Sequence, residues 1–173
     1  MPAGAAENAR PSIAELVAPL LAQCAEGEDK LLLAAAERVA AARYREWAGQ
    51  VGDGQRAGML ACSAREETVA AELEALVPGA GELAPEVATR FPDLGEQYRA
   101  VLGAHRLDEQ FAIQAAAERA GAALLRAYAD AASAEDAERL RSMAELEEAN
   151  AGFLDSVGGG TRPETRADRA TRT

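Results

Sequence analysis

The chain has 173 residues, the size of one ordinary domain and too short for two comfortable ones. Its 18 basic and 29 acidic residues give a formal net charge of −11, which argues against nucleic acid and anionic membrane surfaces as partners. Alanine contributes 44 residues and aromatic residues only 4%. This composition favours helices and nearly excludes an all-β or α/β fold.

The compartment is predicted from what the sequence lacks. No segment resembles a secretion signal, and no run of apolar residues is long enough to cross a bilayer. Cys24 and Cys62 are far apart, each on an apolar face of a predicted helix, so we expect two reduced, buried thiols. A cytoplasmic protein is therefore expected, and a homodimer is an assembly that the sequence leaves open.

The first half of the chain contains signals for a helical segment that begins near residue 12. Residues 1–11 have no apolar periodicity, and we expect them to be disordered. Ser12 and Glu15 have the spacing of a capping box, which predicts that a helix begins at Ser12. Helical patterning continues to about Gln50, with Gly27 as a candidate break.

The remaining elements follow in the same way. A second helix is predicted from about Arg56 to Val77, followed by a connection over residues 78–93, which contain three prolines and two glycines. Helical patterning resumes over about 94–132, and Ser133 is a candidate N-cap for a last helix that reaches about Val157. Residues 159–173 are expected to be disordered.

An internal repeat organises these helices. The sequence AAAER occurs at 34–38 and again at 115–119. The shift that brings residue 34 onto residue 115, here called the repeat offset, also aligns each of the other apolar stripes of the first half with a stripe of the second half. No gap is needed anywhere. We therefore predict that residues 13–77 and 94–158 are structural duplicates.

Each half is predicted to be a helix, a short turn and a second helix, which places the two helices antiparallel. The link between the halves is long enough to cross the length of a helix. The expected fold is an all-α, antiparallel four-helix bundle with a long crossover, in one domain over 12–158. On a straight helix the stripes of residues 94–105 and 114–132 would lie about 100° apart. Kinked or extra N-terminal segments, and thus six shorter helices, stay open.

Each of the four main stripes carries one acid where an apolar residue is expected. At about 1.5 Å per residue, these acids should lie level with one another in one layer of the bundle. Four buried, unpaired charges would be strongly destabilising, and two divalent cations would neutralise them. The predicted layer consists of Glu37, Glu66, Glu118 and Glu147.

The arrangement of these residues resembles the ferritin-like superfamily, and most closely its rubrerythrin-like members. The resemblance covers about 37–154 and includes REET at 65–68 and LEEAN at 146–150. It implies two iron or manganese ions bound by the four glutamates. Glu67 and Glu148 are the alternative ligands if the register is shifted by one residue.

The chain departs from the family pattern at the two histidine ligands. The family has Glu-x-x-His on the second helix of each pair, but here Val69 follows Glu66 and Asn150 follows Glu147 at that spacing. If Glu67 and Glu148 were the ligands, the residues at the histidine positions would be Ala70 and Ala151. The one histidine, His105, lies on a different apolar stripe, and we expect it to be a packed or surface side chain.

The sequence is compatible with two kinds of function, a non-catalytic module and an enzyme. The missing histidines favour a non-catalytic bundle that serves as a binding or structural module. The alternative is a carboxylate-bridged di-iron or di-manganese oxidase or peroxidase of the rubrerythrin-like type. An unrelated helical bundle with four solvated glutamates is also compatible with the sequence. No phosphate loop, CxxC, HExxH or GxSxG motif is present, so other enzyme classes are poorly supported.

Overall fold

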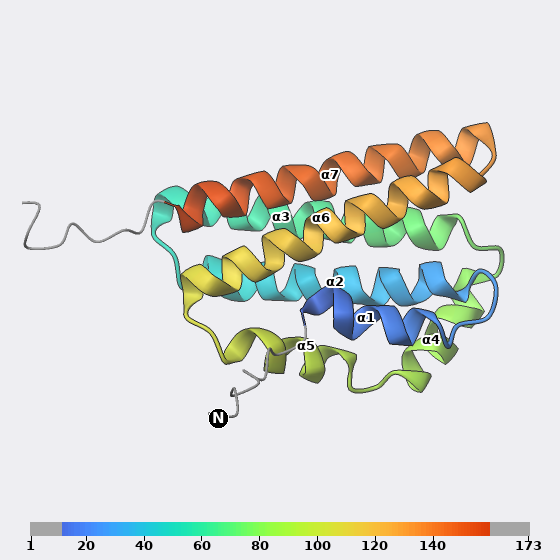
Figure 1. The fold of residues 1–173 in the computed structure, drawn as a ribbon, viewed down its shortest axis with the longest axis horizontal. Helices are drawn as coiled ribbons and strands as arrows, with labels where there is room; N and C mark the ends of the chain where they lie inside the picture. Colours follow the sequence, from blue (N-terminus) through green and yellow to red (C-terminus); the bar gives the residue numbers. More distant parts are fainter. Residues whose placement is uncertain (1–11, 160–173) are drawn as a thin grey trace, which may run out of the picture.

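Seven α-helices and no strand make up residues 12–159, the part of the chain that the computed structural model describes (Figure 1). The all-α class is thus confirmed. The disorder expected for residues 1–11 and 160–173 lies outside the described residues, and Gly159 is the C-cap of the last helix. The helices are α1 (Ile13–Leu21), α2 (Glu28–Ala48), α3 (Asp53–Ala75), α4 (Ala80–Arg90), α5 (Leu94–Gly103), α6 (Leu107–Ala131) and α7 (Ala134–Gly158).

Local signals set most of the helix ends. Ser12 and Glu15 form the predicted capping box at the start of α1. The predicted break at Gly27 is confirmed, because this residue has φ +86° and precedes α2. Ser133 accepts a hydrogen bond from the Asp136 backbone N–H and caps α7. Residues 104–106 interrupt the long segment predicted over 94–132, so the shorter N-terminal helices were the correct alternative.

The connection predicted over residues 78–93 is wrong in one respect, because most of it is the helix α4. Pro85 lies inside this helix and removes one backbone donor. The helix still forms because Val87 is buried and Leu83 is partly buried in a small apolar cluster with Leu31 and Leu32 of α2. Burial of this face outweighs the unfavourable local propensity.

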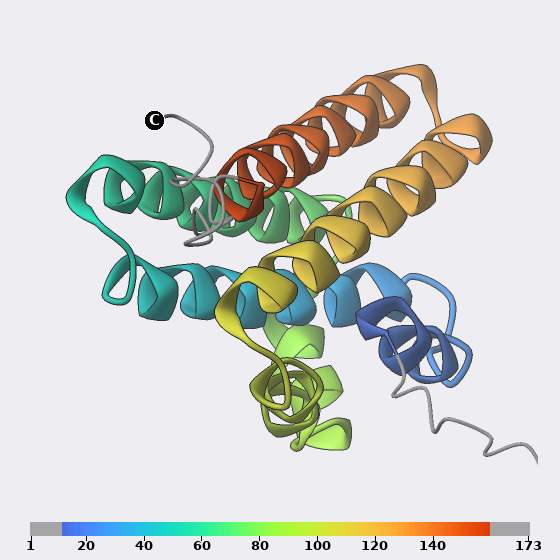
Figure 2. The same ribbon diagram turned by 60° about the vertical axis from the view of Figure 1, so that its left-hand side comes forward.

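The four long helices form two antiparallel pairs, α2 with α3 and α6 with α7 (Figures 1 and 2). Packing of α3 against α7 joins the pairs, and the main apolar core lies between them. The three short helices lie on one side of this arrangement. Among them, α1 packs on α6 and α5 packs on α2, so each covers the long helix of the other half.

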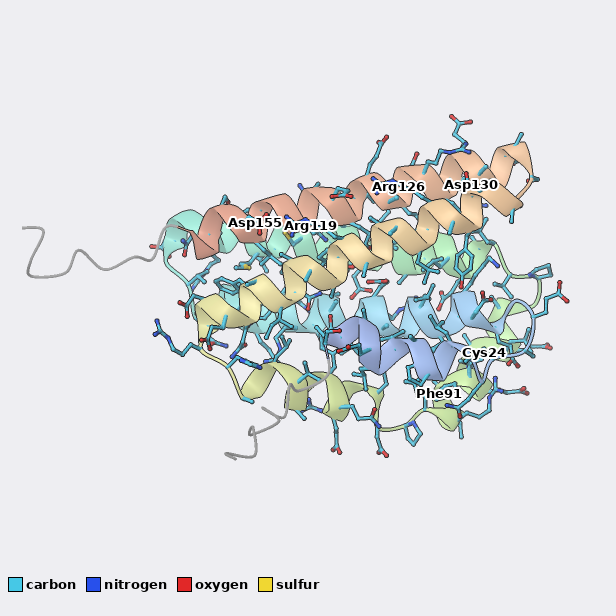
Figure 3. All side chains as sticks on the ribbon, viewed as in Figure 1. Cys24, Phe91, Arg119, Arg126, Asp130 and Asp155 are labelled. Carbon is cyan, nitrogen blue, oxygen red and sulfur yellow. The ribbon has the colours of Figure 1, made fainter. Side chains whose placement is uncertain are left out.

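The helix bounds recur with the repeat offset. Shifting α1 and α3 by this offset brings their first residues onto those of α5 and α7. Two types of ion pair also recur, and Figure 3 marks members of the second copies on α6 and α7. The recurring pairs are Arg45–Glu67 (3.0 Å) with Arg126–Glu148 (2.9 Å), and Arg38–Glu74 with Arg119–Asp155.

Within residues 12–159, no helix combines the length and the apolar character that a membrane span needs.

Candidate metal centre

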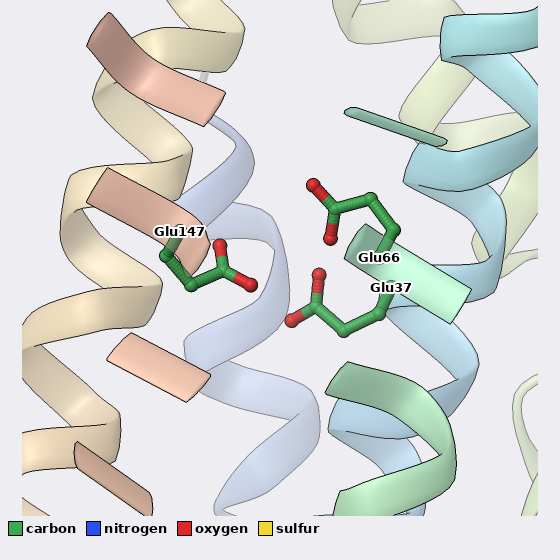
Figure 4. A group of neighbouring side chains, drawn as sticks. All are labelled: Glu37, Glu66 and Glu147. Carbon is green, nitrogen blue, oxygen red and sulfur yellow. The ribbon is translucent and has the colours of Figure 1, made fainter. Parts of the chain in front are cut away.

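Each of the four long helices contributes one glutamate to the interior. Glu66 of α3, Glu118 of α6 and Glu147 of α7 are buried, and Glu37 of α2 is half-buried. One carboxylate oxygen from each of Glu37, Glu66 and Glu147 lies within 4.8 Å of the other two. Figure 4 shows these three carboxylates pointing toward one another from opposite sides of the bundle. Acids from the first and second halves of the chain thus meet at one point.

The helix geometry accounts for this meeting. Glu118 precedes Ala132 by the same number of positions as Glu147 follows Ser133, so the two acids are equally far from a tight turn. Because each residue advances a helix by the same rise, equal spacing from the turn places both acids at one level. Glu37 and Glu66 lie at comparable distances from the turn over 49–52.

Glu118 is held by two hydrogen-bond donors. The Tyr44 hydroxyl donates to Glu118 Oε1 at 2.8 Å, and Gln114 Nε2 donates to the same oxygen at 2.7 Å. The Tyr98 hydroxyl of α5 donates to Gln114 Oε1 at 2.7 Å, which orients the amide. These contacts restrict the Glu118 carboxylate to one position.

Glu66 accepts from a buried amide. Asn150 Nδ2 donates to Glu66 Oε1 at 2.6 Å, and Arg65 Nη1 donates to Asn150 Oδ1 at 3.1 Å. Asn150 occupies the position where the family resemblance would have a histidine ligand. It binds the neighbouring carboxylate instead. At the equivalent position in the first half, Val69 is fully buried and offers no polar atom.

Two carboxylate oxygens of the layer, Glu66 Oε2 and Glu147 Oε1, accept no hydrogen bond from a donor group within residues 12–159. Both belong to side chains with at most 2% exposure. A buried charge without a partner costs several kcal/mol, so such oxygens require a proton or a cation.

The burial of several acids close together changes their pKa values. Burial raises the pKa of Glu37 to about 7, with a further increase from the charge of Glu118, although a hydrogen bond from Glu66 opposes the change. Burial raises the pKa of Glu66 and of Glu147 well above the usual range, and the charges of the neighbouring acids add to the effect. Without a cation, Glu66 and Glu147 therefore favour their protonated forms at neutral pH.

Gly121 provides room for one of these acids. A Cβ atom at this position would lie 3.3 Å from Glu147 Oε2, which is a tight contact. Ala40 occupies the equivalent position in the first half of the chain. The Glu147 carboxylate therefore sits against the bare backbone of α6.

A cavity of ≈ 250 Å³ lies beside the layer, between α1, α2 and α6. Its walls are mostly apolar side chains, including Ile13, Val17 and Leu33, and three of the four acids border it. The sequence did not predict this cavity, because it depends on α1 packing against the other half of the chain.

The remaining candidates lie away from the layer. Glu67 and Glu148, the alternative ligands, form surface ion pairs with Arg45 and Arg126. His105 lies in the turn between α5 and α6, where its Nδ1 atom is 3.8 Å from a carboxylate oxygen of Glu109. None of these three candidates joins the cluster that Glu37, Glu66 and Glu147 form in the described part of the chain.

The hydrogen-bond partners of the acids were not predicted from the sequence. Gln114 and Asn150 lie on apolar stripes, and a polar residue at such a position was the available signal. Tyr98 belongs to a different helix from Gln114 and gave no comparable signal.

Comparisons with known proteins give no further assignment. No protein-family model matches the chain, and no curated protein or solved structure is significantly similar to it.

Proposed function

We propose that this protein is a ferritin-like helical bundle whose layer of four glutamates binds divalent metal ions, as a binding or structural module without catalytic activity. The observation that supports this function most directly is the pair of buried oxygens that lack a donor, Glu66 Oε2 and Glu147 Oε1, beside Glu37. A bound cation would satisfy both oxygens at once.

The donor atoms indicate the kind of metal. Every candidate ligand is a carboxylate oxygen, a hard donor that suits iron(II), manganese(II), magnesium or calcium better than copper or zinc. Glu37, Glu66 and Glu147 would hold one ion, and Glu118 completes the charge needed for two. Four carboxylates neutralise two divalent ions in formal charge, which fits the proposed pair of iron or manganese ions.

The arrangement of helices supports the ferritin-like assignment. Two antiparallel helix pairs each contribute two inward-facing acids, as in carboxylate-bridged di-metal bundles. The absence of a histidine three residues after Glu66 or Glu147 supports a module without catalytic activity. Here the metal would add stability to the folded state.

A second candidate function is a di-iron or di-manganese oxidase or peroxidase. The cavity beside Glu37, Glu118 and Glu147 favours it, because a small reactant could reach the layer there. In that case the bound metals would supply the redox chemistry.

Metal analysis tests the proposed function. We expect protein purified from cells supplemented with iron and manganese to retain two ions per chain. The variants Glu66→Gln and Glu147→Gln should each retain less than half of that amount. The matched controls Glu67→Gln and Glu148→Gln change the neighbouring surface acids and should retain the full amount. A wild type without metal, or equal metal in all variants, would contradict the proposal.

The same samples separate the two functions. If the module has no catalytic activity, the loaded wild type should consume hydrogen peroxide no faster than an equal amount of free metal. Consumption at least tenfold faster that is lost in Glu147→Gln would instead establish the peroxidase alternative.

A further inference from the structure

The cavity beside the acid layer is bordered both by exposed alanines and by buried or half-buried carboxylates. Ala14 and Ala18 of α1 and Ala120 of α6 border the cavity and are exposed, so they form its opening. Glu147 also borders the cavity and is buried, and Glu37 borders it and is half-buried. The cavity therefore has an exposed apolar rim on α1 and α6 and carboxylates that are less exposed than this rim.

The cavity is bordered by carboxylates and by no basic side chain of the described residues. The Tyr98 hydroxyl already donates to Gln114, and the Gln114 amide already donates to Glu118. Glu147 is 2% exposed, and its Oε1 accepts from no donor group of the described residues. A ligand that carries a positive charge would therefore compensate carboxylates that no basic group of the cavity pairs with.

The volume limits the size of the ligand. A dry protein cavity of about 150 Å³ is large enough to bind benzene. By proportion, a cavity of ≈ 250 Å³ accommodates roughly ten non-hydrogen atoms. The apolar walls favour an unbranched or aromatic body, because burial of apolar surface is the main gain that they offer.

We propose that this cavity binds a small primary amine with an apolar body, whose ammonium group lies between Glu147 and Glu37. The amine supplies the positive charge that the cavity lining lacks, and its three N–H groups can donate to the carboxylate oxygens. This inference goes beyond metal binding and does not depend on it, although both ligands use the same carboxylates. A metal ion in the layer therefore competes with the amine.

Calorimetric titration of the metal-free protein, kept in EDTA, tests the proposal with three molecules of nearly the same size. 2-Phenylethylamine carries the ammonium group, 2-phenylethanol replaces it with a neutral hydroxyl, and phenylacetate carries the opposite charge. We expect the amine to bind at least tenfold more tightly than the alcohol and phenylacetate not to bind. Equal binding of amine and alcohol, or no binding of the amine, would overturn the proposal.

Two variants locate the binding site. Ala117→Leu places a larger side chain at the cavity wall and should weaken amine binding at least tenfold. Ala116→Leu changes the adjacent exposed residue of α6 and should have no effect. Glu147→Gln should remove the preference for the amine over the alcohol. Circular dichroism establishes that the variants are folded, and unchanged binding in Ala117→Leu would place the amine elsewhere and refute the site.

Manganese(II) distinguishes this proposal from the proposed metal binding. If both are correct, manganese should weaken amine binding at least fivefold in the wild type. If the metal function alone fails, the amine still binds in EDTA and manganese has no effect on it.

Discussion

Gly121 and Ala40 hold equivalent positions in the repeat, yet only the glycine lies against a carboxylate. An added Cβ at Gly121 would lie 3.3 Å from Glu147 Oε2. Gly152 of α7 gives a matched comparison, because its added Cβ would meet nothing within 4 Å. Both glycines lie inside helices, where glycine is less favourable than alanine.

We expect Gly152→Ala to stabilise the protein by about 0.5–1 kcal/mol, since alanine restricts the unfolded chain and favours the helix. Gly121→Ala should raise the free energy of unfolding by less than half as much as Gly152→Ala, because the new methyl group contacts the Glu147 carboxylate. Urea unfolding of both variants in EDTA measures the difference. An equal gain would mean that Glu147 moves away without resistance.

The hydrogen-bond partners of the acids differ between the two halves. Tyr44 and Gln114 both donate to Glu118, but the residues equivalent to them around Glu37 are Leu125 and Leu33. Asn150 donates to Glu66, but the residue equivalent to Asn150 in the first half is Val69, which has no donor for Glu147, the equivalent of Glu66. The repeat therefore preserves the four acids and not the groups that hydrogen-bond to them.

Among the helices, α1 ends at Leu21 and α2 begins at Glu28, directly after Gly27. The φ of this glycine, +86°, lies in the left-handed region, which residues with a Cβ adopt only with strain. Gly27 ends the turn over residues 22–27, and beyond this turn α1 packs against α6. The cavity beside the acid layer exists only because α1 has this position.

Gly27→Ala should therefore destabilise the protein by about 1 kcal/mol, because alanine must adopt a left-handed conformation. Gly52 offers a control, since it has φ −68° and open space around its Cα. Gly52→Ala should change stability by less than about 0.5 kcal/mol apart from any capping effect. Thermal unfolding of the two variants checks this, and equal midpoints would contradict a conformational role for Gly27.

At the scale of the whole bundle, the acid layer makes the stability of the fold depend on pH. Each of the four long helices contributes one of its acids, so protonation of the layer affects the packing of all four. Burial raises the pKa of Glu37 from 4.5 in the unfolded chain to about 7 in the folded protein. A raised folded-state pKa favours the protonated folded state. Its contribution to stability is full below pH 4.5 and is lost as the pH rises through about 7.

The metal-free wild type should consequently lose stability between pH 5 and pH 8. Glu37→Gln removes the charge, so it should raise the free energy of unfolding by about 1–3 kcal/mol at pH 8 and by less than about 0.5 kcal/mol at pH 5. Urea unfolding in EDTA at both pH values measures this. With manganese bound, the same variant should be less stable than the wild type, because it lacks a ligand. An identical effect at both pH values would contradict protonation of the layer.

Much of the helix pattern could be predicted from short-range signals. The capping residues Ser12 and Ser133 and the break at Gly27 act through their own backbone or through close neighbours in the chain. The level of the acids follows from helix rise and turn position alone. The helix α4 could not be predicted, because Pro85 and Gly81 oppose it locally and burial against α2 stabilises it.

The all-α class, the repeat offset and the four inward-facing acids were accessible from the amino-acid sequence, since each follows from a periodic spacing along the chain. The groups that surround those acids became known through the tertiary structure. Tyr44 meets Glu118, and Asn150 meets Glu66, across separations of 74 and 84 residues. The cavity likewise depends on α1 covering α6 of the other half. Such contacts depend on the packing of whole helices, and periodicity within one helix carries no information about the partner that it packs against.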